Sequence, residues 1–181
     1  CRLLCDVCSA MSLLHSRRLA HRDLTPLNIR CTRAGSAKLF DFGSMTPFGR
    51  SRHVVGTPPF VAPEALHGEI VDAQTDLFAL GATAYYALTG RHAYPARQLR
   101  SLPDVWLQSP PAPSHYVPEI PPALDELVAR LLQLAPSARP PSAAEVMERL
   151  SANGGFDLHE ELVVRQSYLS TPRLVGRDRA L

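Results

Sequence analysis

Apolar residues recur every three to four positions over residues 1–17, and this spacing predicts an amphipathic helix. The apolar stripe consists of Leu3, Leu4, Val7, Cys8, Met11 and Leu14. A second helix is expected to begin at Thr75 or Asp76 and to end at Gly90, since glycine readily closes a helix in the left-handed conformation. Because its remaining faces are also apolar, we expect it to be buried nearly all round. These further apolar positions are Phe78, Ala79, Ala82 and Tyr86.

Between these helices, residues 29–32 and 37–40 are short strand candidates. Residues 33–36 have a turn composition with Gly35, so the two strands are predicted to form a β-hairpin. Residues 44–55 are polar, basic and irregular, which is typical of a mobile loop. Residues 109–122 carry many prolines and are expected to form a connector over the surface.

Two further helices are predicted near the end of the sequence. The first has its apolar stripe at Leu124, Leu127, Val128 and Leu131. Residues 142–145 read Ser-Ala-Ala-Glu, a capping box that predicts the start of the second. The expected fold class is therefore mainly α, with one short β-hairpin inserted between the helices.

Composition excludes several classes of function. The chain has 181 residues and a formal net charge of +2, which is too small to indicate a nucleic acid or an anionic membrane as partner. No apolar run is long enough for a membrane span or a signal peptide. Cys5 and Cys8 lack a second ligand pair at zinc spacing, so we expect buried, reduced thiols on a core-facing helix. This composition favours a cytoplasmic location.

Three polar side chains supply the candidate chemistry. Asp23 lies close in sequence to Asn28, and Asp41 follows the predicted hairpin. Carboxylate and amide oxygens are ligands that Mg²⁺ prefers, and one carboxylate would remain to accept a proton. The spacing therefore indicates a site that combines a divalent cation with a general base.

These residues belong to three motifs, His21-Arg22-Asp23-Leu24-Thr25-Pro26-Leu27-Asn28, Asp41-Phe42-Gly43 and Ala62-Pro63-Glu64. In this order and spacing they resemble the catalytic loop, metal loop and activation segment of a protein kinase. The resemblance covers about residues 1–152 and is to the C-terminal lobe of a bacterial-type serine/threonine kinase. It implies a protein-kinase-like C-terminal lobe as the fold, with ATP and Mg²⁺ as cofactors and a protein as substrate.

The resemblance assigns roles to individual residues. Asp23 falls on the catalytic base, and Asn28 and Asp41 fall on the two Mg²⁺ ligands that bridge the ATP phosphates. His21 and Phe42, which precedes Gly43, fall on residues that stack in the internal spine of the family.

Further residues match structural and regulatory positions. Thr57, in the expected substrate-docking strip 56–60, matches the pattern of serine/threonine rather than tyrosine kinases. Glu64 and Arg139 match a buried ion pair that ties this segment to the last helices. Asp76 matches the carboxylate that holds the catalytic-loop backbone.

Arg22 matches the arginine that receives an activation-loop phosphate in regulated kinases. Ser51 is a candidate for that phosphate, because it stands beside Arg50, Arg52 and His53. An unmodified polar loop is the alternative for this segment.

Two positions depart from the family pattern. The resemblance places Thr25 and Arg30 against the nucleotide, but Thr25 replaces a lysine that contacts the transferring phosphate, and a hydroxyl supplies no charge. Arg30 replaces an apolar residue under the adenine ring, where its guanidinium either stacks on the base or spoils the pocket.

The N-terminal kinase lobe is absent from the sequence, so we expect a fragment, cut at both ends, that does not phosphorylate anything by itself. Residues 153–172 are expected to form a linker, and residues 173–181 resemble the start of a downstream P-loop ATPase module. The leading hypothesis is the catalytic half of a serine/threonine kinase that is active in the intact parent. The alternative is a pseudokinase, a regulatory module that controls an attached ATPase or effector region.

Overall fold

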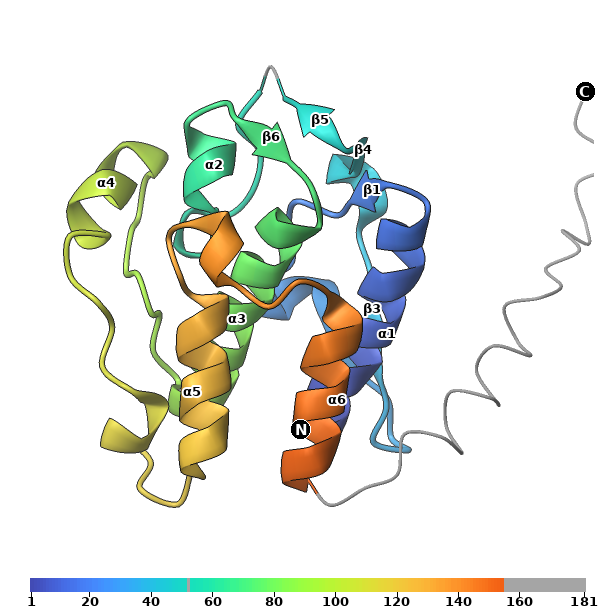
Figure 1. Cartoon of the computed structure of the whole chain (residues 1–181), viewed down its shortest axis with the longest axis vertical. Helices are drawn as coiled ribbons and strands as arrows, with labels where there is room; N and C mark the ends of the chain where they lie inside the picture. The colour runs from blue at the N-terminus through green and yellow to red at the C-terminus, as the bar shows by residue number, and fades with distance from the viewer. Residues whose placement is uncertain (52, 155–181) are drawn as a thin grey trace, which may run out of the picture.

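Two pairs of packed helices organise the computed structural model, which describes residues 1–51 and 53–154 (Figure 1). Helix α1 (Arg2–Ser16) lies alongside α6 (Ala143–Gly154), and α3 (Ala73–Thr89) packs against α5 (Pro122–Leu131). Two one-turn helices, α2 (Pro63–Leu66) and α4 (Leu102–Val105), lie on the side of α3 away from α1. The fold is therefore mainly helical, as the sequence predicts.

Short antiparallel strand pairs join these helices. Strands β2 (Ile29–Cys31) and β3 (Ala37–Leu39) form the predicted hairpin, and Gly35 in its turn has a φ of 79°. Strand β1 (Leu19–Ala20) pairs with β4 (Thr46–Pro47), and β5 (Gly49–Arg50) pairs with β6 (Ile70–Val71).

The expectation of an irregular loop over residues 44–55 is therefore wrong in part. Strands β4 and β5 lie within this segment, and each pairs with a strand elsewhere in the chain. Single 3₁₀ turns complete the connections. They are Pro26–Asn28, Phe42–Ser44, Pro58–Phe60, Leu99–Ser101, Pro113–His115 and Pro136–Ala138.

Helix α3 is the central buried element. It begins at Ala73 rather than at Thr75 or Asp76, because the side chain of Asp72 accepts a hydrogen bond from the Gln74 N–H and caps the helix. Gly90 ends it in the left-handed conformation, as predicted. The helix is buried over most of its surface, but Tyr86 is exposed.

A glycine allows the close packing of α3 on α5. A Cβ atom added at Gly81 would lie 2.6 Å from the Cβ of Leu131, which is closer than real side chains approach. Helix α5 buries Leu124, Leu127, Val128 and Leu131, as its sequence pattern predicts.

Helix α1 turns most of its predicted stripe into the core, where Val7, Cys8 and Met11 are almost completely buried. Leu3 is the exception, since it is 41% exposed at the first turn. Helix α6 begins at Ala143, where the Ser142 hydroxyl accepts a hydrogen bond from the Glu145 N–H, and it runs to Gly154. The rest of the expected linker and the expected ATPase module (residues 173–181) lie outside the described residues.

The cysteines give a test of this packing. Burial raises the pKa of the Cys8 thiol, and Cys5 is buried on the same helix, whereas Cys1 and Cys31 are exposed. Because the thiolate is the reactive form, Cys1 and Cys31 should react with Ellman's reagent in the native chain at about pH 8. Cys5 and Cys8 should react only after unfolding in guanidinium. Mass spectrometry that finds Cys5 or Cys8 modified in the native chain would contradict this fold.

Candidate active site

The buried carboxylate of Asp76 anchors the loop that carries the predicted base. Asp76 is completely buried on α3, and its Oδ2 and Oδ1 accept hydrogen bonds from the backbone N–H groups of His21 (2.8 Å) and Arg22 (2.9 Å). The ring Nε2 of His15 lies 2.9 Å from Oδ2 of the same carboxylate. A buried charge needs such partners, so this geometry fixes residues 21 and 22 against α3.

The Asp23 carboxylate is oriented by contacts to both of its oxygens. Its Oδ1 accepts hydrogen bonds from the Thr57 backbone N–H (3.1 Å) and from the Thr57 hydroxyl (3.0 Å). The Asn28 amide group donates to Oδ2 (3.1 Å) and to the Asp23 backbone carbonyl (2.8 Å). Asp23 is only half-buried, so it remains open to a ligand.

Backbone and ring contacts bring Asp41 to the same end of the molecule. The Phe40 N–H donates to the Asn28 carbonyl oxygen (2.8 Å), and the His21 ring Nε2 lies 3.1 Å from the Phe40 carbonyl oxygen. The His21 and Phe42 rings meet edge to face at 5.4 Å. Asp41 is therefore held between Phe40, which is tied to Asn28, and Phe42, which is tied to His21.

Backbone conformation at this site is unusual. Arg22 and Asp41 both have positive φ values, 70° and 57°, which non-glycine residues adopt at a cost. The Asp41 carboxylate accepts a hydrogen bond from the Gly43 N–H (3.3 Å), and a Cβ at Gly43 would lie 3.2 Å from that carboxylate. Asp41 is thus exposed, and its carboxylate is oriented by the Gly43 N–H.

The oxygen donors of Asn28 and Asp41 fit a hard cation. Because the Asn28 NH₂ group is committed to Asp23, its carbonyl oxygen is the atom left for a ligand. Within residues 1–51 and 53–154, no group of three or more His, Cys, Asp or Glu residues could hold a metal. Mg²⁺ is commonly bound by one or two protein oxygens together with substrate phosphates, and this pair suits that mode.

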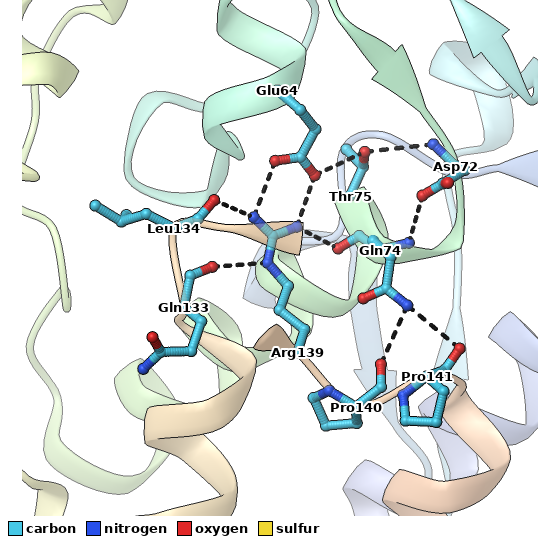
Figure 2. A network of polar contacts seen from close by, with 9 residues as sticks. All are labelled: Glu64, Asp72, Gln74, Thr75, Gln133, Leu134, Arg139, Pro140 and Pro141. Carbon is cyan, nitrogen blue, oxygen red and sulfur yellow. Dashed lines mark hydrogen bonds and ion pairs between the residues drawn. The ribbon is translucent and has the colours of Figure 1, made fainter. Parts of the chain in front are cut away.

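A buried ion pair fixes the segment that carries Thr57 (Figure 2). The Arg139 guanidinium donates to both carboxylate oxygens of Glu64, at 2.6 and 2.9 Å. It also donates to the backbone carbonyl oxygens of Gln74 (2.8 Å), Gln133 (2.7 Å) and Leu134 (3.0 Å). Every N–H group of the Arg139 guanidinium thus donates a hydrogen bond, and the pair is buried away from water.

The same network reaches the start of α3. The Thr75 hydroxyl donates to Glu64 Oε1 (3.0 Å), and Thr75 also takes part in the capping box with Asp72. The Gln74 side-chain amide donates to the carbonyl oxygens of Pro140 (3.1 Å) and Pro141 (3.2 Å). Asp76 lies in the first turn of α3, and Glu64 is hydrogen-bonded to Thr75 in the same turn. Both anchors are therefore tied to the start of one helix.

Ser51 and Arg22 meet at one backbone group. The Ser51 hydroxyl donates to the His53 carbonyl oxygen (2.9 Å), and the Arg22 guanidinium donates to the same oxygen. Burial lowers the pKa of Arg22, while the nearby Asp76 carboxylate opposes that shift. Arg50 is exposed on β5, and Arg52 lies outside the described residues.

Thr25 and Arg30 occupy very different surroundings. Thr25 is only 2% exposed, so its burial weighs against a contact between its hydroxyl and a nucleotide. Arg30 is exposed on β2 directly opposite Lys38 on β3. Two like charges in that cross-strand position destabilise a hairpin, and neither forms an ion pair with any residue that the structure describes.

Sequence reasoning missed His15 and gave Gly56, within the 56–60 strip, no role of its own. His15 bonds to Asp76, but nothing in the helical pattern marks it as the partner of a residue 61 positions away. Gly56 has a φ of 125°, and a Cβ there would lie 3.0 Å from the Arg22 carbonyl oxygen. Only glycine lets the 56–60 strip approach the loop so closely. The signal for it was the position of this glycine immediately before Thr57.

Comparisons with known proteins show which family the sequence matches. A family model described as "Protein kinase domain" matches residues 2–150. The chain is 36% identical over 150 residues to the serine/threonine-protein kinase PksC of Streptomyces coelicolor, a match that covers 78% of this chain and 27% of the relative. It is 37% identical over 153 residues to the serine/threonine-protein kinase Pkn1 of Myxococcus xanthus, covering 78% and 22%.

A third relative is the serine/threonine-protein kinase PknB of Mycolicibacterium smegmatis, which is 30% identical over 152 residues. That match covers 80% of this chain and 24% of the relative. The chain thus spans about a quarter of the length of these curated relatives.

The Glu64–Arg139 pair gives a stability test. Arg139→Met leaves the Glu64 carboxylate buried without its cation, so the free energy of unfolding should fall by about 3–5 kcal/mol. Arg149→Met is the matched control, because Arg149 forms a partly exposed pair with Glu145 and its loss should cost about 1 kcal/mol or less. Urea unfolding followed by circular dichroism measures both. Equal losses in the two variants would contradict the anchoring role of Arg139.

Proposed function

The chain belongs to the protein kinase family, and from that premise we propose that it is the catalytic half of a serine/threonine protein kinase. In the intact parent it transfers the γ-phosphate of ATP to the hydroxyl group of a protein serine or threonine. The observation that carries this proposal is the direct hydrogen bond between Asn28 and Asp23, together with the hydrogen bonds of Phe40 to Asn28 and His21, which bring the neighbouring Asp41 to the same end of the molecule.

Asp23 is the proposed base. Thr57 and Asn28 hold its two carboxylate oxygens, so the carboxylate can orient the attacking hydroxyl and accept its proton without first reorganising. The hydrogen bonds from Thr57 to Asp23 join the 56–60 strip to the proposed base, next to which the acceptor residue of a substrate would bind. This contact supports a serine or threonine as the acceptor, as the resemblance implies.

Asn28 and Asp41 are the proposed holders of Mg²⁺, through the Asn28 amide oxygen and the Asp41 carboxylate. A Mg²⁺ ion held by these two oxygens would supply positive charge to offset the charge of the transferring phosphate. The chain contributes a fixed orientation of both groups. Gly43 leaves room for the Asp41 side chain, and the left-handed backbone at residue 41 directs it.

A second lobe is proposed to cover this end of the molecule in the parent. Leu27 is 82% exposed, and Phe40 and Phe42 expose nearly half of their surfaces beside Asp41. Apolar groups clustered at a site indicate that another element packs there. Lys38 is exposed opposite Arg30, so the lysine that holds the phosphates in this family must come from that lobe.

We propose a cytoplasmic location, where ATP is available and thiols stay reduced. Of the helices that the structure describes, none has the length and apolar character needed to cross a bilayer.

A pseudokinase is the second candidate, and two observations favour it. Thr25 is buried and supplies no charge to a transferring phosphate, and Arg30 lies beside a second cation instead of offering an apolar floor to adenine. In this reading the site binds nucleotide weakly or not at all, and the domain regulates an attached ATPase or effector region.

The two functions are separated by one assay. The full-length parent should transfer ³²P from γ-labelled ATP to itself or to a generic protein, and Asp23→Asn should lower that rate by at least about a hundredfold because the base is lost. Circular dichroism confirms that both proteins are folded. Transfer in neither folded protein would refute the enzyme and leave the pseudokinase.

The chain alone should show no transfer in the same assay, because the groups that hold the phosphates are not among its residues. Arg22→Ala and Asp23→Asn versions of the chain should give the same background signal. Turnover by the isolated chain that depends on Asp23 would refute the requirement for a second lobe.

A further inference from the structure

A hollow of about 390 Å³ opens between the end of α3, the segment that follows it, and the proline-rich connector after α4. Its volume lies within the range of about 300–1,000 Å³ that is typical of ligand pockets. Rings, prolines and a few polar side chains line it, among them Tyr85, His92, Asp104, Gln108, Pro110 and Tyr116. A smaller hollow of about 230 Å³ adjoins it and shares Tyr85 and Pro110.

This hollow is connected to the proposed base by a chain of contacts. The His92 ring meets the Phe60 ring edge to face at 5.5 Å and stacks on Tyr86 at 4.9 Å. The Phe60 N–H donates to the Thr57 carbonyl oxygen (2.9 Å), and Thr57 bonds to Asp23. The hollow therefore lies next to the 56–60 strip, which contacts the proposed base.

The lining favours an uncharged aromatic occupant. The Tyr85 hydroxyl already donates to the Pro111 carbonyl oxygen (3.0 Å), so it needs no ligand to satisfy it. The Arg91 guanidinium lies 4.7 Å from the centre of the Tyr116 ring and would repel a cation there. Burial lowers the pKa of His92, which keeps this ring neutral at pH 7. Prolines and neutral rings pack well against another ring.

Resting on the proposed function, we propose that this hollow binds an aromatic side chain of the protein substrate, at a fixed number of residues from the phosphorylated hydroxyl. The domain would then select substrates by an aromatic residue near the acceptor. Asp104 is exposed at the hollow, on helix α4, and forms no ion pair among the residues that the structure describes, so a basic occupant is the competing outcome.

The test measures binding to the folded chain without any phosphoryl transfer. Fluorescein-labelled peptides carry alanine in place of the acceptor serine in a neutral background, with one phenylalanine placed at each position in turn. A second series carries arginine in place of phenylalanine. Fluorescence anisotropy should show one or two adjacent phenylalanine positions that tighten binding about tenfold or more, the gain expected from burying one ring.

Two variants locate the effect. Ser109→Phe places a ring at a residue that lines both hollows and should remove the tenfold gain. Leu107→Phe is the control, because Leu107 is 83% exposed and lines neither hollow, and it should keep the gain. Near-ultraviolet circular dichroism checks that both variants are folded.

Three results would overturn the proposal: an equal gain at every phenylalanine position, a gain that survives Ser109→Phe, or tighter binding of the arginine series that Asp104→Asn removes. None of these depends on catalysis. A parent that phosphorylates proteins without this preference would refute the aromatic pocket alone. If the chain binds tightly only those peptides with phenylalanine at one or two adjacent positions, but the parent transfers no phosphate, the enzyme alone is refuted.

Discussion

The carboxylate of Asp76 is the constraint on which the rest of the site depends. It is completely buried, and its partners are the backbone N–H groups of His21 and Arg22, in the proposed catalytic loop, and the His15 ring. A charge in such surroundings is stable only while its partners stay in place, so the loop cannot leave α3 without exposing an unpaired carboxylate to the core. Helix α3, capped at Asp72 and buried from Thr75 to Tyr85, supports this arrangement.

A series of hydrogen bonds connects the loop held by Asp76 to Asn28 and Asp23. His21 reaches the Phe40 carbonyl oxygen, Phe40 bonds to Asn28, and Asn28 bonds to Asp23. The second anchor, Glu64 with Arg139, holds the segment that delivers Thr57 to Asp23. Both anchors meet at the first turn of α3, which gives one physical reason why Asp23, Asn28 and the 56–60 strip are held together.

Local patterns were sufficient to predict the elements whose causes are local. The hairpin with Gly35, the end of α3 at Gly90 and the stripe of α5 follow from turn chemistry, helix capping and periodicity. Strands β4 and β5 could not be predicted, because two-residue strands exist only through pairing with β1 and β6. Asp72 was missed as the cap of α3, although an aspartate before a helix is a local capping signal. His15 was missed as a partner of Asp76 because helical periodicity carries no information about a contact between distant residues. The burial of Thr25 likewise depends on packing that sequence spacing does not report.

Amide hydrogen exchange of His21 and Arg22 in the wild-type chain and in Asp76→Ala tests the anchor most directly. Loss of the acceptor should speed exchange at these two amides by at least about tenfold more than at Leu127 and Val128 in the core of α5, because local opening costs less than global unfolding. Equal acceleration at the loop and in α5 would mean that Asp76 only supports global stability. That result would contradict the claim that this carboxylate positions the catalytic loop.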